Sequence, residues 1–406
     1  MKTILATTYA VNPYKGSEDG MGWNFIRQIA RFNKVIAITR ENNQAAIEQF
    51  MVENPDEIYH NIQFLYFDLP YWMRFWKRGG RGAMLYFWMW QRAIPKFVSR
   101  QKIDFDIVHN LNFHNDWTPS YLWKLGKPFV WGPIGHHPAI PTQYLKPYKK
   151  IQALRDKTMW VIKQLFWRFS SDLRNTAKNA NHILCMNRSV TDVMNIERQQ
   201  HSIMPSVATD DFGHNLNERR KKFSLISAGR LVPLQGFDLC INSFASFLSK
   251  LPDERKTQCE LMIIGSGPEK ANYVALAKEL GVEKFIHFVD WMERNELMQL
   301  MKDASAFVFP SHEGAGMIVA EALSFGVPVI CLDNSGPGQF IDEACGIKVP
   351  QQNYGETVSD LSEGIFQLFS DRNKWKKMRE KARERFEQYF HWDRRGESLQ
   401  TIYQQL

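Results

Sequence analysis

The stretch ASAFVFPSHEGAGMIVAEALSFGVPVICLDNSGPGQFIDEACGIKVP, residues 304–350, decides the fold. Two short apolar runs, 307–310 and 327–330, predict strands. The segment 317–325 between them predicts a helix, because Gly326 suits a left-handed helix end and a proline soon follows. The stretch therefore reads as strand, glycine-rich loop, helix and strand, the parts of a βαβ unit.

The loop Glu313-Gly314-Ala315-Gly316 stands at the expected N-terminus of this helix. Unpaired backbone N–H groups and the helix dipole favour an anion there, and small residues let phosphates approach closely. Glu313 lies at the mouth of the loop, and Glu321 lies about two turns into the helix. Since carboxylates accept hydrogen bonds from hydroxyl groups, the pair suits hydroxyl recognition on either side of a diphosphate.

The spacing of these glutamates, with EALSFGVPVI and CLDNSGPGQF after them, resembles the E-x7-E signature of the retaining family-4 glycosyltransferases. That family has the α/β GT-B fold, two Rossmann-like domains that face each other across a cleft, with a C-terminal helix returning to the first domain. The resemblance implies that Glu313 contacts the donor sugar and Glu321 the nucleotide ribose. The alternative is an ordinary βαβ unit with two solvated glutamates. The implied diphosphate ligands are the backbone amides of Gly314, Ala315, Gly316 and Met317.

The segment GRLVPLQG, 229–236, is similar to the family motif G-R-L-x-x-x-K-G, whose two cations neutralise the diphosphate. Arg230 matches, but Gln235 stands where the lysine is expected. An amide can bond a phosphate oxygen, yet it cannot offset negative charge on a leaving group, and one such loss can cost about 3 kcal/mol. Either another cation compensates, with Lys15 and Lys348 as candidates, or activity is weak.

Glycine loops elsewhere also resemble parts of the family's donor site. The first strand, 2–9, a loop that includes Gly16 and Ser17, and a helix at 24–31 are how a Rossmann-like domain begins. In register with the family, this loop faces the donor diphosphate. The nucleotide and its base would be lined by Gly265 and Gly267, in the loop of a later strand.

Four histidines, His109, His114, His136 and His137, fall at neighbouring strand ends, where ligands bind in open α/β sheets. None has helical i, i+4 spacing and only Asp116 is nearby, so we expect no metal site. Most family members carry an active-site histidine after the fifth strand. The nearest to that place is His136, which is the first candidate, and His114 is the second.

The chain has 406 residues and a net charge of +8. Residues 1–205 hold 27 Lys and Arg against 15 Asp and Glu, whereas residues 206–406 hold 24 against 28. The basic excess therefore lies in the first half and indicates contact with an anionic surface. Five scattered cysteines, no signal peptide and no apolar span of membrane length point to a reducing cytosol.

Two segments of the first half, 70–101 and 144–174, interleave aromatic and basic residues. Such mixtures suit a membrane interface, because rings settle at the headgroup level and cations meet anionic lipids. The alternative is that the aromatics fill the core beneath a solvated basic face. Single-stranded nucleic acid would want the same mixture, but no nucleic-acid motif accompanies it. The membrane-binding candidates are Arg74, Trp76, Lys77, Arg78 and Arg81.

We therefore expect an acceptor and membrane-facing domain at 1–205, a linker at 206–222, a donor domain at 223–385, and a returning helix at 386–406. The resemblance implies metal-independent transfer of a sugar, with retention, from a UDP- or GDP-sugar to a lipid-linked saccharide. The enzyme would lie peripherally on the cytosolic membrane face and serve surface polysaccharide or O-antigen-type assembly. Two alternatives are a noncatalytic nucleotide-sugar-binding partner subunit and a GT-B nucleotide-sugar epimerase.

Overall fold

The computed structural model describes residues 1–77, 82–111, 115–148, 150–196, 200–213, 216, 222–290 and 292–406. The chain forms two compact units, and a break between them, at Ala208 and Thr209, falls in the segment predicted as the linker. The segment 137–160 packs with the second unit, which the sequence does not predict. Unit 1 comprises Met1–His136, Val161–Ala208 and Trp392–Leu406, and unit 2 comprises His137–Trp160 and Thr209–His391.

In the described part of unit 1, seven parallel strands form a sheet in the order β3-β2-β1-β4-β5-β6-β7. The order reverses at β1, as in a doubly wound Rossmann-like domain. The strands are β1 (Thr3–Thr7), β2 (Lys34–Thr39), β3 (Ile62–Tyr66), β4 (Ile107–Asn110), β5 (Phe129–Ile134), β6 (His182–Cys185) and β7 (His201–Ile203).

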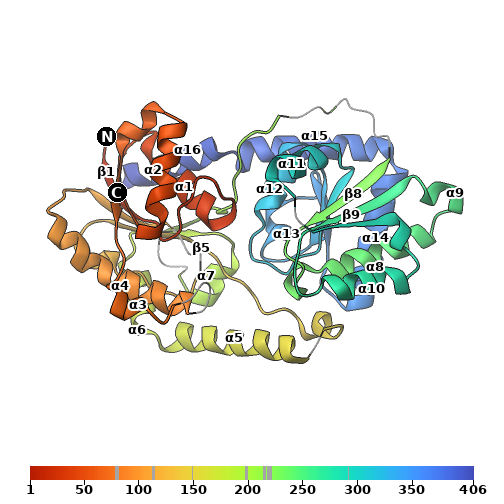
Figure 1. Ribbon diagram of the computed structural model, residues 1–406, viewed down its shortest axis with the longest axis horizontal. Coiled ribbons are helices and arrows are strands. Elements are labelled where there is room, and N and C mark those ends of the chain that lie inside the picture. Colours follow the sequence, from red (N-terminus) through yellow and green to blue (C-terminus); the bar gives the residue numbers. More distant parts are fainter. Residues whose placement is uncertain are drawn as a thin grey trace. The chain divides into compact units, whose positions relative to one another are not determined.

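The helices of unit 1 cover this sheet (Figure 1). They are α1 (Ser17–Ala30), α2 (Gln44–Glu53), α3 (Tyr71–Arg74), α4 (Ala83–Gln101), α6 (Ser171–Asn179), α7 (Ser189–Met194) and α16 (Trp392–Gln405), and α5 (Lys150–Phe169) holds residues of both units. Helix α4 buries Tyr86, Trp90 and Ile94 in the core, at a spacing of one helical face. For these aromatic residues, the prediction that rings fill the core is confirmed.

Helix α1 begins at Ser17, seven residues before the helix predicted from the glycine loop. Its first turn carries Glu18 and Asp19, which the positive end of the helix dipole stabilises. Gly20 lies inside the helix, where a Cβ would stand 2.3 Å from the carbonyl oxygen of Lys15. This glycine therefore permits a close backbone approach, and the expected loop is shorter than predicted.

In the described part of unit 2, six parallel strands form a second sheet in the order β10-β9-β8-β11-β12-β13. The strands predicted on both sides of the glutamate loop are β11 and β12, which pair directly. The strands are β8 (Phe223–Ala228), β9 (Cys259–Ile264), β10 (Ile286–Val289), β11 (Ala306–Phe309), β12 (Val329–Leu332) and β13 (Gly346–Val349).

Figure 1 shows α8, α10 and α14 on one face of this sheet and α11, α12 and α15 on the other. The core beneath α8 and α14 is a continuous apolar cluster that includes Phe244, Phe247 and Leu368. Helices of unit 2 are α8 (Phe237–Ser249), α9 (Asp253–Lys256), α10 (Lys270–Glu279), α11 (Arg294–Asp303), α12 (Met317–Ser324), α13 (Pro337–Phe340), α14 (Tyr354–Ser370) and α15 (Arg372–Tyr389). Short 3-10 helices are η1 (Glu41–Asn43), η2 (Glu57–Asn61), η3 (Leu122–Leu125), η4 (Thr142–Leu145), η5 (Pro233–Gln235) and η6 (Glu283–Phe285).

The last helix, α16, returns to unit 1, as predicted (Figure 1). The Trp392 ring meets Phe25 of α1 edge to face, with centroids 5.4 Å apart. Arg31 at the end of α1 pairs with Asp393 at 2.7 Å. Apolar packing and an ion pair together hold the chain's last segment on its first helix.

Among the described residues, no helix combines the length and the apolar character that crossing a membrane requires.

Candidate nucleotide-sugar site

Three loops interlock at the carboxyl edge of the unit 2 sheet, where ligands bind in open α/β sheets. Gly265, after β9, has φ +142°, and a Cβ on it would stand 1.9 Å from the carbonyl oxygen of Gly229 after β8. Only glycine fits there, so the two loops touch. The His312 amide, after β11, donates to the Leu234 carbonyl at 2.9 Å. These contacts bring together three of the predicted donor-site loops, all of which belong to unit 2.

Glu313 lies at the mouth of the loop that precedes α12 and is partly buried. The side-chain amide of buried Gln235 donates a hydrogen bond to its carboxylate. Burial raises the pKa of Glu313 to about 7, although the charge of Arg230 and the bond from Gln235 act in the opposite direction. Arg230 itself is exposed to solvent. This end of the site therefore joins a carboxyl group near its midpoint of ionisation to a neutral amide.

Glu321 lies inside α12, with only 4% of its side chain exposed. Its carboxylate forms an ion pair with Arg294, the first residue of α11, at 2.5 Å. Burial raises the pKa of Glu321, and the charge of Arg294 opposes that rise. Sequence reasoning missed Arg294, because nothing in its local pattern shows that α11 places its first residue beside Glu321.

His137 is the histidine that reaches the glutamate loop. Its Nδ1 accepts a hydrogen bond from the Gly314 amide at 3.2 Å. The first candidate from the sequence is its neighbour His136, whose catalytic role stays a prediction, and no local signal separates two adjacent histidines. With Nδ1 as the acceptor, a neutral imidazole carries its proton on Nε2 and can donate from there.

His136 belongs to unit 1 and is buried. Its Nδ1 lies 2.8 Å from a carboxylate oxygen of Asp116, and its carbonyl accepts a hydrogen bond from Asn187 at 3.0 Å. The second candidate, His114, lies outside the described residues. His109 lies in the sheet core between Tyr403 and the Gly132 carbonyl, and burial lowers its pKa to about 3, so it is a neutral structural residue.

The remaining predicted donor-site residues occupy loop or helix-start positions. Gly16 is the N-cap of α1 in unit 1, and the side chain of Ser17 lies outside the described part of the chain. A Cβ on Gly267 would meet the Leu231 carbonyl oxygen at 2.3 Å. Gly314, Ala315 and Gly316 precede α12, which begins at Met317. Their roles toward a ligand stay predictions.

The predicted membrane-binding residues that the structure describes, Arg74, Trp76 and Lys77, have structural partners. Arg74 pairs with Asp68 and with Glu41, each at 3.2 Å. Trp76 is partly buried and donates to a backbone carbonyl, and Lys77 lies over the Tyr86 ring at 5.6 Å. Arg78 and Arg81 lie outside the described residues. The function of all five residues as a membrane surface stays a prediction.

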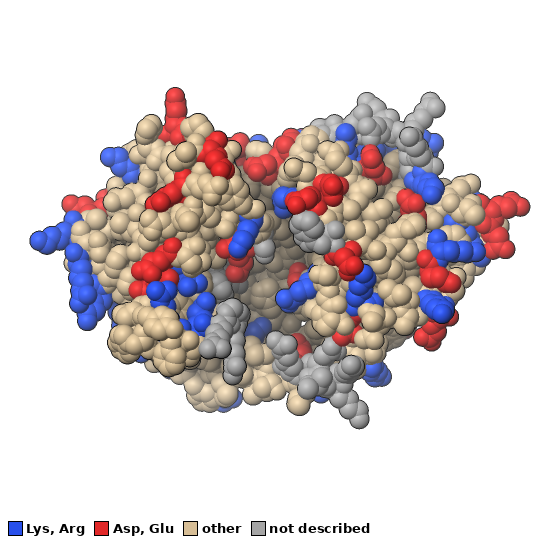
Figure 2. Space-filling view, in the orientation of Figure 1, with Lys and Arg blue, Asp and Glu red and all other residues tan. Residues whose placement is uncertain are grey.

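Exposed aromatic side chains occur on helix α3 and at its C-terminal end. Tyr71, Trp72 and Phe75 are 60 to 75% exposed. Figure 2 shows an uncharged surface over α3, with basic side chains beside it. Exposed apolar side chains also occur on α4, at Leu85, and on α5, at Leu154, Val161 and Leu165.

A cavity of about 500 Å³ lies beside the glutamate loop, at the same edge of the sheet. The loop that carries Asn334 wraps round it, and the Asn334 amide donates to the Ser311 carbonyl at 2.7 Å. Burial lowers the pKa of His312 to about 4, so the imidazole that lines the cavity is neutral. The lining residues are Pro138, Ala139, Pro141, His312, Asp333, Asn334, Ser335, Gln339 and Gln351.

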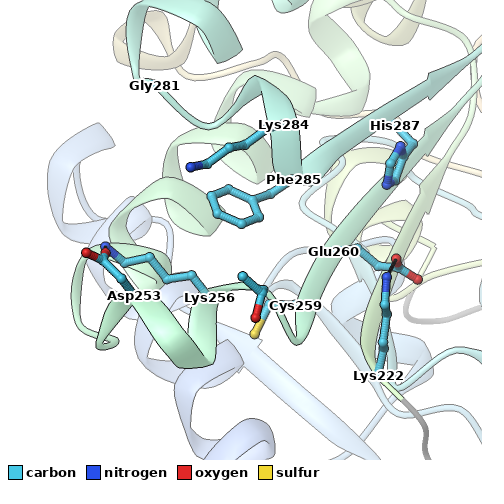
Figure 3. A pocket seen from close by; sticks show the side chains of 10 residues that line it. Lys222, Asp253, Lys256, Cys259, Glu260, Gly281, Lys284, Phe285 and His287 are labelled. Atoms are coloured by element: carbon cyan, nitrogen blue, oxygen red, sulfur yellow. Dashed lines mark hydrogen bonds and ion pairs between the residues drawn. The ribbon is translucent and has the colours of Figure 1, made fainter.

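A second cavity, of about 600 Å³, lies where β8, β9 and β10 begin (Figure 3). Two of its lysines are paired, Lys222 with Glu260 at 3.2 Å and Lys256 with Asp253 at 2.8 Å. This is the amino edge of the sheet, opposite the edge that binds ligands in such folds. The larger cavity is therefore not the candidate donor site.

Across the described ranges, no three His, Cys, Asp or Glu side chains gather closely enough to hold a metal ion.

Two doubly wound units joined by a returning C-terminal helix form the GT-B architecture. The structure of Anabaena HepE in complex with UDP has this arrangement over 100% of both chains, with a TM-score of 0.64 and 14% identity. Residues 209–385, most of unit 2, match the family of glycosyl transferases group 1. The GT-B fold agrees with the expectation from the sequence, and the family match of this segment extends to glycosyl transferases group 1.

Two relatives match part of the chain at 28% identity. One is the GDP-mannose-dependent monoacylated alpha-(1-6)-phosphatidylinositol monomannoside mannosyltransferase of Corynebacterium glutamicum, over 43% of this chain and 45% of the relative. The other is the lipopolysaccharide glucosyltransferase WaaG of Escherichia coli, over 34% and 35%. The matched segments span less than half the length of these relatives.

Proposed function

We propose that the protein is a glycosyltransferase that uses a nucleotide-diphosphate sugar as donor. The observation that carries this proposal is the loop before α12, where two carboxylates flank backbone amides at the ligand-binding edge of a segment matching glycosyl transferases group 1. A helix N-terminus there stabilises the diphosphate. The fold alone does not specify the chemistry, so the site residues bear the argument.

In this proposal the donor lies along the loop. Glu321 accepts hydrogen bonds from the ribose, and Arg230 stabilises the diphosphate as it leaves. Glu313 positions the sugar, and the neighbouring cavity beside His312 offers room and amide groups for its hydroxyls. The Gly314 amide exchanges its bond to Nδ1 of His137 for one to a phosphate oxygen.

We further assign retention at the anomeric carbon and no metal requirement. A retaining reaction without a protein nucleophile lets the leaving phosphate take the proton of the acceptor hydroxyl as the new glycosidic bond forms. The acceptor is a lipid-linked saccharide at the cytosolic membrane face. The basic excess of residues 1–205 and the exposed rings of α3 support a membrane surface, and the names of both relatives refer to glycolipid or lipopolysaccharide substrates.

Calorimetric titration with UDP and with GDP, without metal, tests the donor site. We expect saturable binding of one nucleotide, weakened about tenfold in Arg230→Ala because a charge-assisted contact is lost. The matching nucleotide sugar is then incubated without acceptor, and NMR of the sugar released by slow hydrolysis reports its anomeric configuration. No binding of either nucleotide contradicts the proposal, and an inverted product contradicts retention.

Sedimentation with anionic vesicles tests the membrane assignment. We expect Trp72→Ser with Phe75→Ser to lower binding at least about fivefold, since exposed rings contribute apolar contact at the headgroup level. Val274→Ser, which changes an exposed apolar residue of α10, is the control. Replacing Arg74, Lys77, Arg78 and Arg81 with serine tests the basic part. Binding unchanged in both sets contradicts the membrane surface.

A noncatalytic partner subunit is the second candidate, and Gln235 favours it. Where the family carries a lysine, this chain places an amide that bonds Glu313 and adds no charge to the diphosphate site. A subunit of this kind binds the donor nucleotide without turning it over. Donor consumption by the purified protein with a membrane lipid extract separates the two functions, because only the enzyme consumes donor.

A further inference from the structure

Arg294 holds the carboxylate that is expected to meet the ribose. Its Nη2 lies 2.5 Å from Oε1 of Glu321, and the two side chains are 45% and 4% exposed. The arginine therefore reaches from the surface of α11 to a buried carboxylate inside α12. An ion pair with one member buried and the other at the solvent is stronger than a fully exposed pair.

An aromatic ring fixes the arginine from its other side. The guanidinium carbon of Arg294 lies 5.6 Å from the centre of the Phe212 ring. Phe212 in turn stacks on Phe325, with centroids 5.8 Å apart and an interplanar angle of 22°. A guanidinium over an aromatic face gains cation–π attraction, so Arg294 is anchored by contacts to both a carboxylate and a ring.

The other charged groups around α12 form hydrogen bonds or ion pairs with groups other than Glu321. From α15, Arg379 donates to the Gly326 carbonyl and Arg383 to the Ser324 carbonyl, both at the far end of α12. Arg383 also pairs with Asp211 at 2.5 Å. Strands β11 and β12 face the helix with apolar residues and the thiol of Cys331, whose pKa burial raises well above its usual value. The remaining charged residues of α11 are Glu296, Lys302 and Asp303.

The buried carboxyl of Glu321 therefore depends on Arg294 for its charge. Burial raises its pKa, and the charge and hydrogen bond of Arg294 are the causes that lower it. Without the arginine, the carboxyl takes up a proton at a higher pH. A protonated carboxyl offers weaker acceptors to hydroxyl groups than a carboxylate does.

We propose that Arg294 is a positioning residue that keeps Glu321 ionised and oriented to accept hydrogen bonds from the ribose hydroxyls, so that the site selects ribonucleotides over 2′-deoxyribonucleotides. This inference rests on the proposed function, because it requires a nucleotide at α12. Phe212 supports the same geometry through Arg294. The selectivity requires both residues, because Glu321 supplies the hydrogen-bond acceptor and Arg294 holds it in place.

The test measures the affinity of the full chain for UDP, GDP and the 2′-deoxy form of whichever binds, by calorimetry at pH 6 and pH 8. The variants are Arg294→Met, which keeps much of the side-chain volume, Arg294→Lys, which keeps the charge, and Phe212→Ala. Lys302→Met, on the same helix and outside the site, is the matched control. Thermal melting of each variant checks that it folds.

We expect Arg294→Met to weaken binding about 30-fold, and more at pH 6 than at pH 8, because a charge-assisted acceptor is lost and the carboxyl is protonated more readily without the arginine. The preference for the ribonucleotide falls from about tenfold to about twofold. Arg294→Lys restores most of the affinity, and Phe212→Ala costs about threefold. If Arg294→Met does not fold, Arg294→Lys and Phe212→Ala test the proposal through the ratio of the affinities for the ribonucleotide and its 2′-deoxy form.

If Arg294→Met loses the same affinity at both pH values and keeps the preference for the ribonucleotide, the proposal is overturned. Arg294 would then act on the phosphates or on the fold alone. Affinity unchanged in Arg294→Met also overturns it. Failure of UDP and GDP to bind the wild-type protein contradicts the proposed function instead.

Discussion

Glu313 and Glu321 lie on either side of the same loop and differ in their partners. Glu313, at the mouth of the loop, receives a hydrogen bond from the neutral amide of Gln235. Glu321, inside α12, has a cation, Arg294, at 2.5 Å. Burial is the largest cause of a raised pKa at both positions. Burial therefore disfavours ionisation of both carboxyl groups, and the partners that oppose this effect differ.

The difference suggests different roles for the two glutamates in the proposed donor site. The arginine fixes charge and orientation at Glu321, which suits a constant task such as ribose binding. Glu313 lies near its midpoint of ionisation, so a ligand can change its charge at little cost. In the proposed site we therefore expect Glu321 to contribute to nucleotide affinity and Glu313 to the reaction at the sugar.

The largest expected effect comes from Glu313→Gln. We expect turnover of the nucleotide sugar to fall about 1000-fold, since a group that positions the reacting sugar is lost. The affinity for the nucleotide should change less than about threefold. Steady-state rates with calorimetry measure both, and a variant that keeps more than a tenth of the wild-type turnover contradicts this difference in roles.

The next largest effect is expected in Glu321→Gln, and it concerns nucleotide affinity rather than turnover. We expect nucleotide affinity to fall about 30-fold, because an ionised acceptor of two hydroxyl hydrogen bonds becomes a neutral amide. Turnover at saturating donor should fall only a few-fold. Loss of turnover without loss of affinity would show that the two glutamates do not divide the work in this way.

A smaller effect on turnover is expected when a cation is added beside Glu313, where the family motif has a lysine. In Gln235→Lys an ammonium replaces the amide beside Glu313 and beside the expected diphosphate. We expect turnover to rise about fivefold through stabilisation of the leaving group. Gln258→Lys, at an exposed position, is the matched control. Wild-type and Gln235→Lys proteins that both bind donor without consuming it would support the partner-subunit function.

The smallest effect is on thermal stability. The folded-state pKa of Glu313 is about 7, above its value of 4.5 in an unfolded chain, so folding favours the protonated form. That contribution is complete below about pH 4.5 and is lost as the pH rises through 7. Glu313→Gln does not titrate, so we expect its melting temperature to exceed that of the wild type by about 3 °C at pH 8 and to equal it at pH 5.

Differential scanning calorimetry at both pH values measures this change, with Glu296→Gln at an exposed position as the control. An equal shift at the two pH values would indicate a packing effect and contradict the assigned ionisation.

The strands predicted at residues 2–9, 307–310 and 327–330 correspond to β1, β11 and β12, because short apolar runs bounded by glycine or proline are local signals. The start of α1 could not be predicted, since the glycines that indicated a loop serve a close backbone approach at Gly20. The glutamate loop was predicted from its own residues and their spacing.

The partners of the glutamates could not be predicted in the same way. Arg294 reaches Glu321, and His137 reaches Gly314, from other segments of the chain. Which of two adjacent histidines contacts the loop depends on how 137–160 packs with unit 2. Gln235 was identified because it departs from a motif, but its bond to Glu313 required the fold. Pairings of this kind are set by tertiary packing, which no local pattern encodes.

A crystal structure of the protein with UDP or GDP tests the central claim most directly. We predict the diphosphate on the amides of residues 314–317 and the ribose hydroxyls on Glu321, with Arg294 still paired to that carboxylate. A nucleotide bound instead in the lysine-lined cavity at the opposite edge of the sheet would contradict the account (Figure 3). So would a ribose that contacts Glu313 while Glu321 makes no contact with the ligand.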